Sequence, residues 1–124
     1  MMQTAVMRAR KKLNVAYPNL YAVPGVHEKA DAFNRVQRGH QNYLENVGEF
    51  RTLALIGGLK HPYAVAIGGI LFSVGSYLYL LGYSDVSLDV KMARYKKGSG
   101  IKWIGLLTAL YSTISFSGSL LSWW

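Results

Sequence analysis

Three polar side chains of different chemistry follow one another along a predicted helix. Arg38, Asn42 and Glu45 are a cation, a neutral amide and an anion, spaced four and three residues apart. Residues at these spacings lie on one face of an α-helix and are neighbours there. The set predicts a site for a zwitterionic ligand that carries carboxylates, amides and an ammonium group.

Glutathione has this inventory of groups. An arginine can hold a carboxylate through two hydrogen bonds, while Glu45 would pair with the ammonium and Asn42 would bond to backbone amides. The thiol of glutathione has an ordinary pKa of about 8.5, which must fall before the thiol is a good nucleophile at neutral pH. A fixed positive charge near the sulfur lowers that pKa by stabilising the thiolate.

The same stripe also has a structural interpretation. Arg35 lies one turn before Arg38, and Glu49 follows Glu45 at helical spacing, so five polar residues share the stripe. Ionisable groups that face lipid cost several kcal/mol, so we expect the stripe to face protein, ligand or a wet crevice. A buried polar seam can instead fix the register of packed helices, and the spacing leaves both interpretations open.

Two long segments without charge must position this stripe. No Asp, Glu, Lys or Arg occurs from His61 to Ser84, or from Trp103 to Trp124. Each segment is longer than the roughly 20 apolar residues that cross a hydrocarbon core as a helix. We therefore predict membrane helices at about 62–83 and 101–123, with the stripe on a third helix at about 29–56. The 124 residues then form a single membrane helix-bundle domain, 1–124.

The composition excludes several classes of protein. Apolar residues make up 51% of the chain and charged residues 16%, which argues against a small soluble enzyme. The net charge of +8 does not indicate a nucleic-acid binder, because the basic residues flank apolar runs as they do in membrane loops. The chain has no cysteine, which excludes disulfides and thiolate metal sites, and we expect no bound metal.

Small and hydroxyl residues predict how the apolar helices pack. The 62–83 segment holds small residues that permit close helix approach: Ala64, Gly68, Gly69, Ser73, Gly75 and Ser76. The 101–123 segment is rich in hydroxyls, which can bond back to helix carbonyls: Thr108, Ser112, Thr113, Ser115, Ser117 and Ser119.

The run Phe33 to Glu45, Phe-Asn-Arg-Val-Gln-Arg-Gly-His-Gln-Asn-Tyr-Leu-Glu, resembles the signature helix of the MAPEG superfamily, membrane-associated proteins in eicosanoid and glutathione metabolism. It is most similar to the type 3 microsomal glutathione transferases. Further resemblances follow in chain order. Ala9–Lys12 with Val15–Pro18 resembles the end of the first family helix and the loop after it, and Gly57-Gly58 with His61-Pro62 resembles the second turn. Tyr79–Tyr83 resembles the Tyr-x-x-Gly-Tyr motif of the family.

This resemblance implies an all-α integral membrane fold, an antiparallel helix bundle of the MAPEG type. Three of the family helices are expected in the sequence, with the first family helix missing or truncated. The implied assembly is a homotrimer in a membrane of the endoplasmic reticulum or of an organelle, mitochondrial or plastid. Glutathione, as co-substrate, would bind between subunits, and a lipophilic substrate would enter from the bilayer.

The resemblance also implies roles for individual residues. The glutathione-binding set would be Arg10, Lys11, Arg38, Asn42, Glu45, Tyr79 and Tyr83. Arg94 or Lys91 would be the catalytic cation, because family members activate the thiol with an arginine shortly after the tyrosine motif. Packing at the lipid interface is the alternative for the two tyrosines, and an ordinary juxtamembrane charge is the alternative for Arg94.

Two functions follow from these expectations. The first is a membrane glutathione transferase or peroxidase that acts on apolar electrophiles or lipid hydroperoxides. The second is a non-catalytic structural subunit of a larger membrane complex. The expected loss of the first helix favours the second function, as does Ser76, which stands where relatives carry an arginine.

Basic residues predict the topology. The cluster Arg8–Lys12 and the loop Lys91–Lys102 should share the cytosolic side, or its organellar equivalent, whereas the turn at Lys60 should lie opposite. Cysteines introduced at Lys60 and Lys96 should therefore react with an impermeant thiol reagent from opposite sides of sealed vesicles. Labelling of both from one side would contradict the topology.

Overall fold

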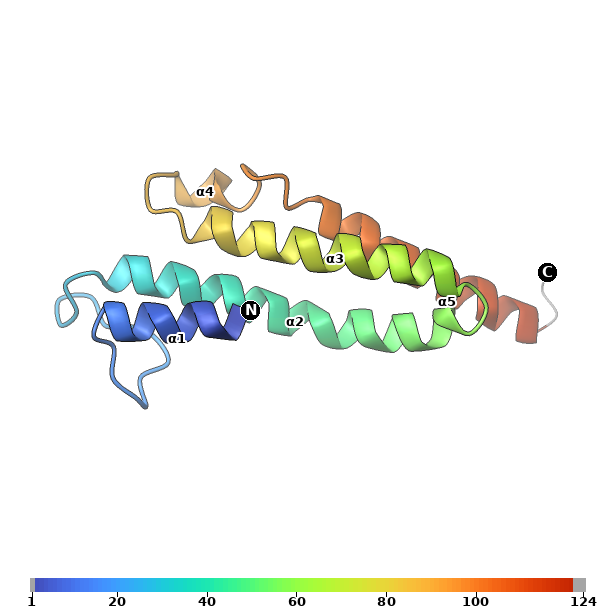
Figure 1. Cartoon of the computed structure of the whole chain (residues 1–124), viewed down its shortest axis with the longest axis horizontal. Coiled ribbons are helices and arrows are strands. Elements are labelled where there is room, and N and C mark those ends of the chain that lie inside the picture. Colours follow the sequence, from blue (N-terminus) through green and yellow to red (C-terminus); the bar gives the residue numbers. More distant parts are fainter. Residues whose placement is uncertain (1, 122–124) are drawn as a thin grey trace. The chain divides into compact units, whose positions relative to one another are not determined.

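The computed structural model describes residues 2–121, which form five helices and no strand (Figure 1). In chain order the helices are α1 (Met2–Lys12), α2 (Ala30–Gly58), α3 (Pro62–Tyr83), α4 (Val90–Ala93) and α5 (Ile101–Leu120). The all-α prediction is confirmed.

The three long helices begin and end close to their predicted bounds. The segment at 62–83 is α3, and the segments at 29–56 and 101–123 correspond to α2 and α5. The predicted end of the last helix, with Trp123 and Trp124, falls outside the described residues. Helix α1 begins at Met2 and contains Ala9–Lys12, the residues that resemble the end of the first family helix.

Helix α3 has the clearest membrane character. Its apolar window has a mean hydropathy of 1.9, and within residues 2–121 it is the one helix long and apolar enough to cross a membrane by length and composition. Helix α2 carries the charged stripe, and hydroxyl side chains lower the hydropathy of α5. The crossing of the membrane by α2 and α5 stays a prediction.

The chain divides into two compact units. The first joins the segment up to Tyr43 to Tyr77–Ser99, and the second joins Leu44–Ser76 to the segment from Gly100 onward. The first unit has an apolar core between α1, the following loop and the start of α2, built from Val6, Val15, Ala22, Ala30 and Phe33. Phe33 is fully buried in it.

In the second unit, α3 and α5 pack backbone against backbone. A Cβ atom at Gly105 would overlap the carbonyl oxygen of Gly68, and a Cβ at Gly75 would overlap the amide of Lys102. Helices can approach this closely only where a side chain is missing. The prediction that small residues of 62–83 allow close approach is confirmed at Gly68 and Gly75.

Hydroxyl groups of α5 bond to helix carbonyls, as predicted. Thr108 donates to the carbonyl of Ile104 at 2.8 Å, and Thr113 donates to that of Ala109 at 2.9 Å. Thr113 also lies 2.8 Å from the carbonyl of Leu53 on α2. The two carbonyls share the single hydroxyl proton, so Thr113 bonds within its own helix and also links α5 to α2.

We predict that Gly105→Ala destabilises the protein while Gly69→Ala does not. The new methyl at 105 would overlap backbone atoms of Gly68 and Phe72, whereas a methyl at 69 would lie 3.7 Å from the Phe50 ring, an ordinary contact. Overpacking of this kind costs about 1–3 kcal/mol. Thermal unfolding in detergent checks this, and equal midpoints for the two variants would contradict it.

Candidate functional site

A cavity of about 260 Å³ lies in the first unit. Its lining is Tyr21, Asp31, Asn34, Arg35, Arg38, Tyr83 and Val90. It therefore brings Arg38 and Tyr83, two of the predicted site residues, to one place. Cationic, anionic, amide and phenol groups surround the same space, which suits a ligand with charges of both signs.

Asn34 bonds to the backbone of the segment that carries Tyr21, another residue of the cavity lining. Its side-chain amide accepts a hydrogen bond from the backbone N–H of Ala22 at 2.7 Å and donates to the carbonyl of the same residue at 2.9 Å. The neighbouring Tyr21 hydroxyl bonds to the side-chain oxygen of Gln41 on α2. These contacts hold the irregular 13–29 segment against α2, which places Tyr21 at the cavity.

Tyr83 connects the cavity to the predicted catalytic arginine. Its ring stacks on that of Tyr79, with centroids 5.7 Å apart and an interplanar angle of 16°. The guanidinium carbon of Arg94 lies 6.0 Å from the centroid of the Tyr83 ring and 5.9 Å from that of Tyr95. The structure thus gathers Arg38, Tyr79, Tyr83 and Arg94 in the first unit.

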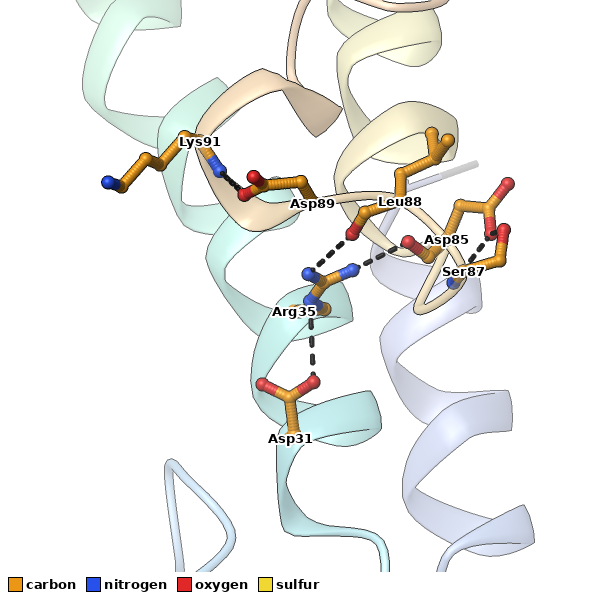
Figure 2. Close-up of polar contacts among 7 residues, drawn as sticks. All are labelled: Asp31, Arg35, Asp85, Ser87, Leu88, Asp89 and Lys91. Carbon is orange, nitrogen blue, oxygen red and sulfur yellow. Dashed lines mark hydrogen bonds and ion pairs between the residues drawn. The ribbon is translucent and has the colours of Figure 1, made fainter.

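Arg94 and Lys91, the two predicted catalytic cations, have different surroundings. Arg94 follows α4 and is half-buried; its Nε is buried and has no hydrogen-bond partner among the described residues. Lys91 is exposed, and Figure 2 shows its side chain extending away from the loop that precedes α4. Arg94 is therefore the better placed of the two cations beside Tyr83.

Arg10 and Lys11 line a different cavity, of about 490 Å³. The Nη1 of Arg10 donates to the carbonyls of Val15 at 3.2 Å and Asn19 at 2.7 Å. The guanidinium also lies over the rings of Tyr17 and Phe33, at 4.4 and 4.9 Å. Arg10 thus holds the loop after α1, and the glutathione contact of Arg10 and Lys11 stays a prediction.

Asn42 and Glu45 lie further along α2 and do not line the 260 Å³ cavity. Asn42 is half-buried and Glu45 is exposed. Their role in holding a ligand stays a prediction.

Tyr21, Asp31 and Asn34 line the cavity and were not among the predicted site residues. The four-residue spacing of Asp31 and Arg35 is a signal for their ion pair, whose atoms lie 3.4 Å apart. Asn34 lies inside the Phe33–Glu45 run, although its type alone does not indicate that it holds a loop. Tyr21 belongs to an irregular segment, where periodicity gives no information on placement.

The MAPEG family sequence model matches residues 1–115. The match includes α1 to α4, most of α5 and every predicted site residue. The resemblance stated from the Phe33–Glu45 run is confirmed at the level of the family, and the type 3-like subgroup stays a prediction.

We predict an acid-sensitive loop between α3 and α4. Hydrogen bonds from the Ser87 hydroxyl and amide, with a smaller contribution from Lys97, lower the pKa of Asp85. Because the pKa is lower in the folded loop, this contribution to loop order is present above the ordinary carboxyl pKa and is lost as the pH falls through the lowered value.

Carboxyl NMR titration of Asp85 checks this prediction. Ser87→Ala should raise the pKa toward its ordinary value and Lys97→Ala should raise it less, while Lys96→Ala is the matched control and should leave it unchanged. An unchanged Asp85 pKa in Ser87→Ala would contradict the assignment.

Proposed function

Because the chain belongs to the MAPEG family, whose members are membrane-integral proteins that use glutathione, we propose that it is a glutathione transferase or peroxidase. Its substrates would be apolar electrophiles or lipid hydroperoxides that enter from the bilayer. The family match supports a membrane role of the glutathione and eicosanoid type in general. The particular reaction is our proposal from the cavity in the first unit.

One observation carries this proposal: Tyr83 lines the same cavity as Arg38 and also lies beside the guanidinium of Arg94. An arginine at the cavity can hold a carboxylate of glutathione in a two-point hydrogen bond. A second, half-buried arginine can then stabilise the thiolate, because its charge is less screened than a charge in water. The two tasks need two cations at separate positions, and Arg38 and Arg94 meet that need.

The chemistry requires few protein groups. The bound thiol loses its proton to water, and the positive charge of Arg94 keeps the thiolate favoured near neutral pH. The thiolate sulfur then attacks the electrophilic carbon, so that a carbon–sulfur bond forms and the leaving group departs. With a hydroperoxide, the thiolate attacks the outer oxygen instead, an alcohol leaves, and a second glutathione completes the disulfide and releases water.

We further propose that Asn42 and Glu45 contact the amides and the ammonium of glutathione, and that the active assembly is a homotrimer. Helix α3 supports the membrane setting, since its length and hydropathy suit a membrane crossing. A substrate dissolved in lipid would reach the thiolate without passing through water.

The thiolate signal tests the proposal. Purified protein mixed with glutathione should show ultraviolet thiolate absorbance near neutral pH, and Arg94→Ala should lose it together with conjugating activity. Each unit of pKa regained lowers the thiolate fraction about tenfold at a fixed pH below the pKa. Lys91→Ala is the matched control and should keep most of the signal.

Absence of the signal and of activity in the unmodified protein would contradict the enzyme and favour the structural subunit. Equal loss in Arg94→Ala and Lys91→Ala would contradict the assignment of Arg94.

A further inference from the structure

Arg35 joins α2 to the loop between α3 and α4. Its Nη1 donates to the carbonyl of Asp85 at 2.5 Å and its Nη2 to the carbonyl of Leu88 at 3.0 Å. Its Nε lies 3.4 Å from a carboxylate oxygen of Asp31 (Figure 2). We call this arrangement of Arg35 with the two loop carbonyls the Arg35 clamp.

Arg35 is buried, whereas its ion-pair partner Asp31 is exposed. The Arg35 side chain is 6% exposed, whereas that of Asp31 is 76% exposed. The exposed ion pair contributes little, because water screens it. The two carbonyl contacts are the main compensation for burying the guanidinium, since a buried charge without partners is strongly destabilising. Separation of the loop from α2 would therefore leave a buried cation poorly paired.

The clamped loop also has hydrogen bonds of its own. The Asp85 carbonyl also accepts from the amide of Leu88 at 3.2 Å, and the Asp85 carboxylate accepts from the Ser87 hydroxyl at 2.6 Å. The next residue, Asp89, caps α4 by accepting from the amide of Lys91 at 2.9 Å. A shift of Leu88 would therefore displace the start of α4.

The position of α4 determines where Arg94 lies. Ala93 is fully buried, and a Cβ at Gly82 on α3 would overlap the Ala93 carbonyl, so α4 has no room to move toward α3. Arg94 directly follows α4. Its place beside Tyr83 depends on how the loop and α4 are held.

We propose that Arg35 is a positioning residue: through the carbonyls of Asp85 and Leu88 it holds α4 so that Arg94 stays beside Tyr83. The inference rests on the proposed function for its catalytic consequence, whereas the clamp itself does not. Arg35 is one turn from Arg38 on α2. The same helix therefore carries Arg35 and Arg38, both at the cavity, and through the clamp it holds the arginine assigned to the thiolate.

Two readouts on the full-length protein in detergent test the proposal. The first is hydrogen exchange at the amides of Leu88, Met92 and Ala93, which are protected by bonds to Asp85 and Asp89. The second is the pH midpoint of the thiolate absorbance of bound glutathione. Because Arg35 lines the cavity, loss of its charge alone can move that midpoint, so the positioning role is read from Arg35→Lys, which keeps the charge.

Arg35→Gln should raise exchange at the three amides at least tenfold, with the amides of α5 unchanged, and should shift the thiolate midpoint upward. Arg35→Lys should give intermediate values, because an ammonium lacks the planar fork that reaches two carbonyls together. It also serves as the folded variant if the glutamine variant does not fold. Asp31→Asn is the matched control for the exchange readout and should leave exchange at the three amides unchanged, because Asp31 does not contact the loop carbonyls.

Unchanged exchange at these amides in both Arg35 variants would overturn the clamp. Faster exchange with an unmoved thiolate midpoint would overturn the positioning role and leave Arg35 as a stabilising residue. Absence of a thiolate signal in the unmodified protein would instead overturn the proposed function, and the exchange measurement would still decide whether the clamp orders the loop.

Discussion

Buried arginines that donate to backbone carbonyls hold the irregular segments of the first unit in place. A loop outside regular structure leaves carbonyl oxygens without helix or sheet partners, and burial makes such groups costly. Arg10 supplies donors to the loop after α1, and Arg35 supplies them to the loop after α3. One planar guanidinium can satisfy several carbonyls together, which a lysine cannot do as well.

The second unit reaches close packing by a different route. There α3 and α5 meet at glycines, and hydroxyl side chains bond to helix carbonyls rather than to water. This arrangement suits an apolar surrounding. There the hydrophobic effect contributes little to helix association, which is driven instead by close backbone contact, dispersion and internal hydrogen bonds. Arginines bonded to loop carbonyls occur in the first unit, which has the irregular loops, and glycines occur where α3 and α5 pack directly.

The sequence predicts the long helices and their packing residues well, because periodicity and residue size act locally. Gly68, Gly75 and Thr113 have the roles expected from their types. The four-residue α4 was not predicted, since it is too short for a periodic pattern and depends on a single cap at Asp89. The carbonyl partners of Arg10 and Arg35 cannot be predicted from a residue pattern. Every residue has a backbone carbonyl, and only the fold determines which carbonyls meet a side chain.

The surroundings of each arginine, more than its type, determine what it can do. At Arg10 and Arg35 the backbone already occupies guanidinium donors, so fewer N–H groups are available to a ligand. Arg94 lies instead beside the rings of Tyr83 and Tyr95. Such a contact is an attraction between the cation and the ring, and it does not use a backbone carbonyl as acceptor. The proposed role of Arg94 at a thiolate rests on this difference in surroundings, because stabilisation of an anion requires a cation whose donors are not already taken up by the backbone.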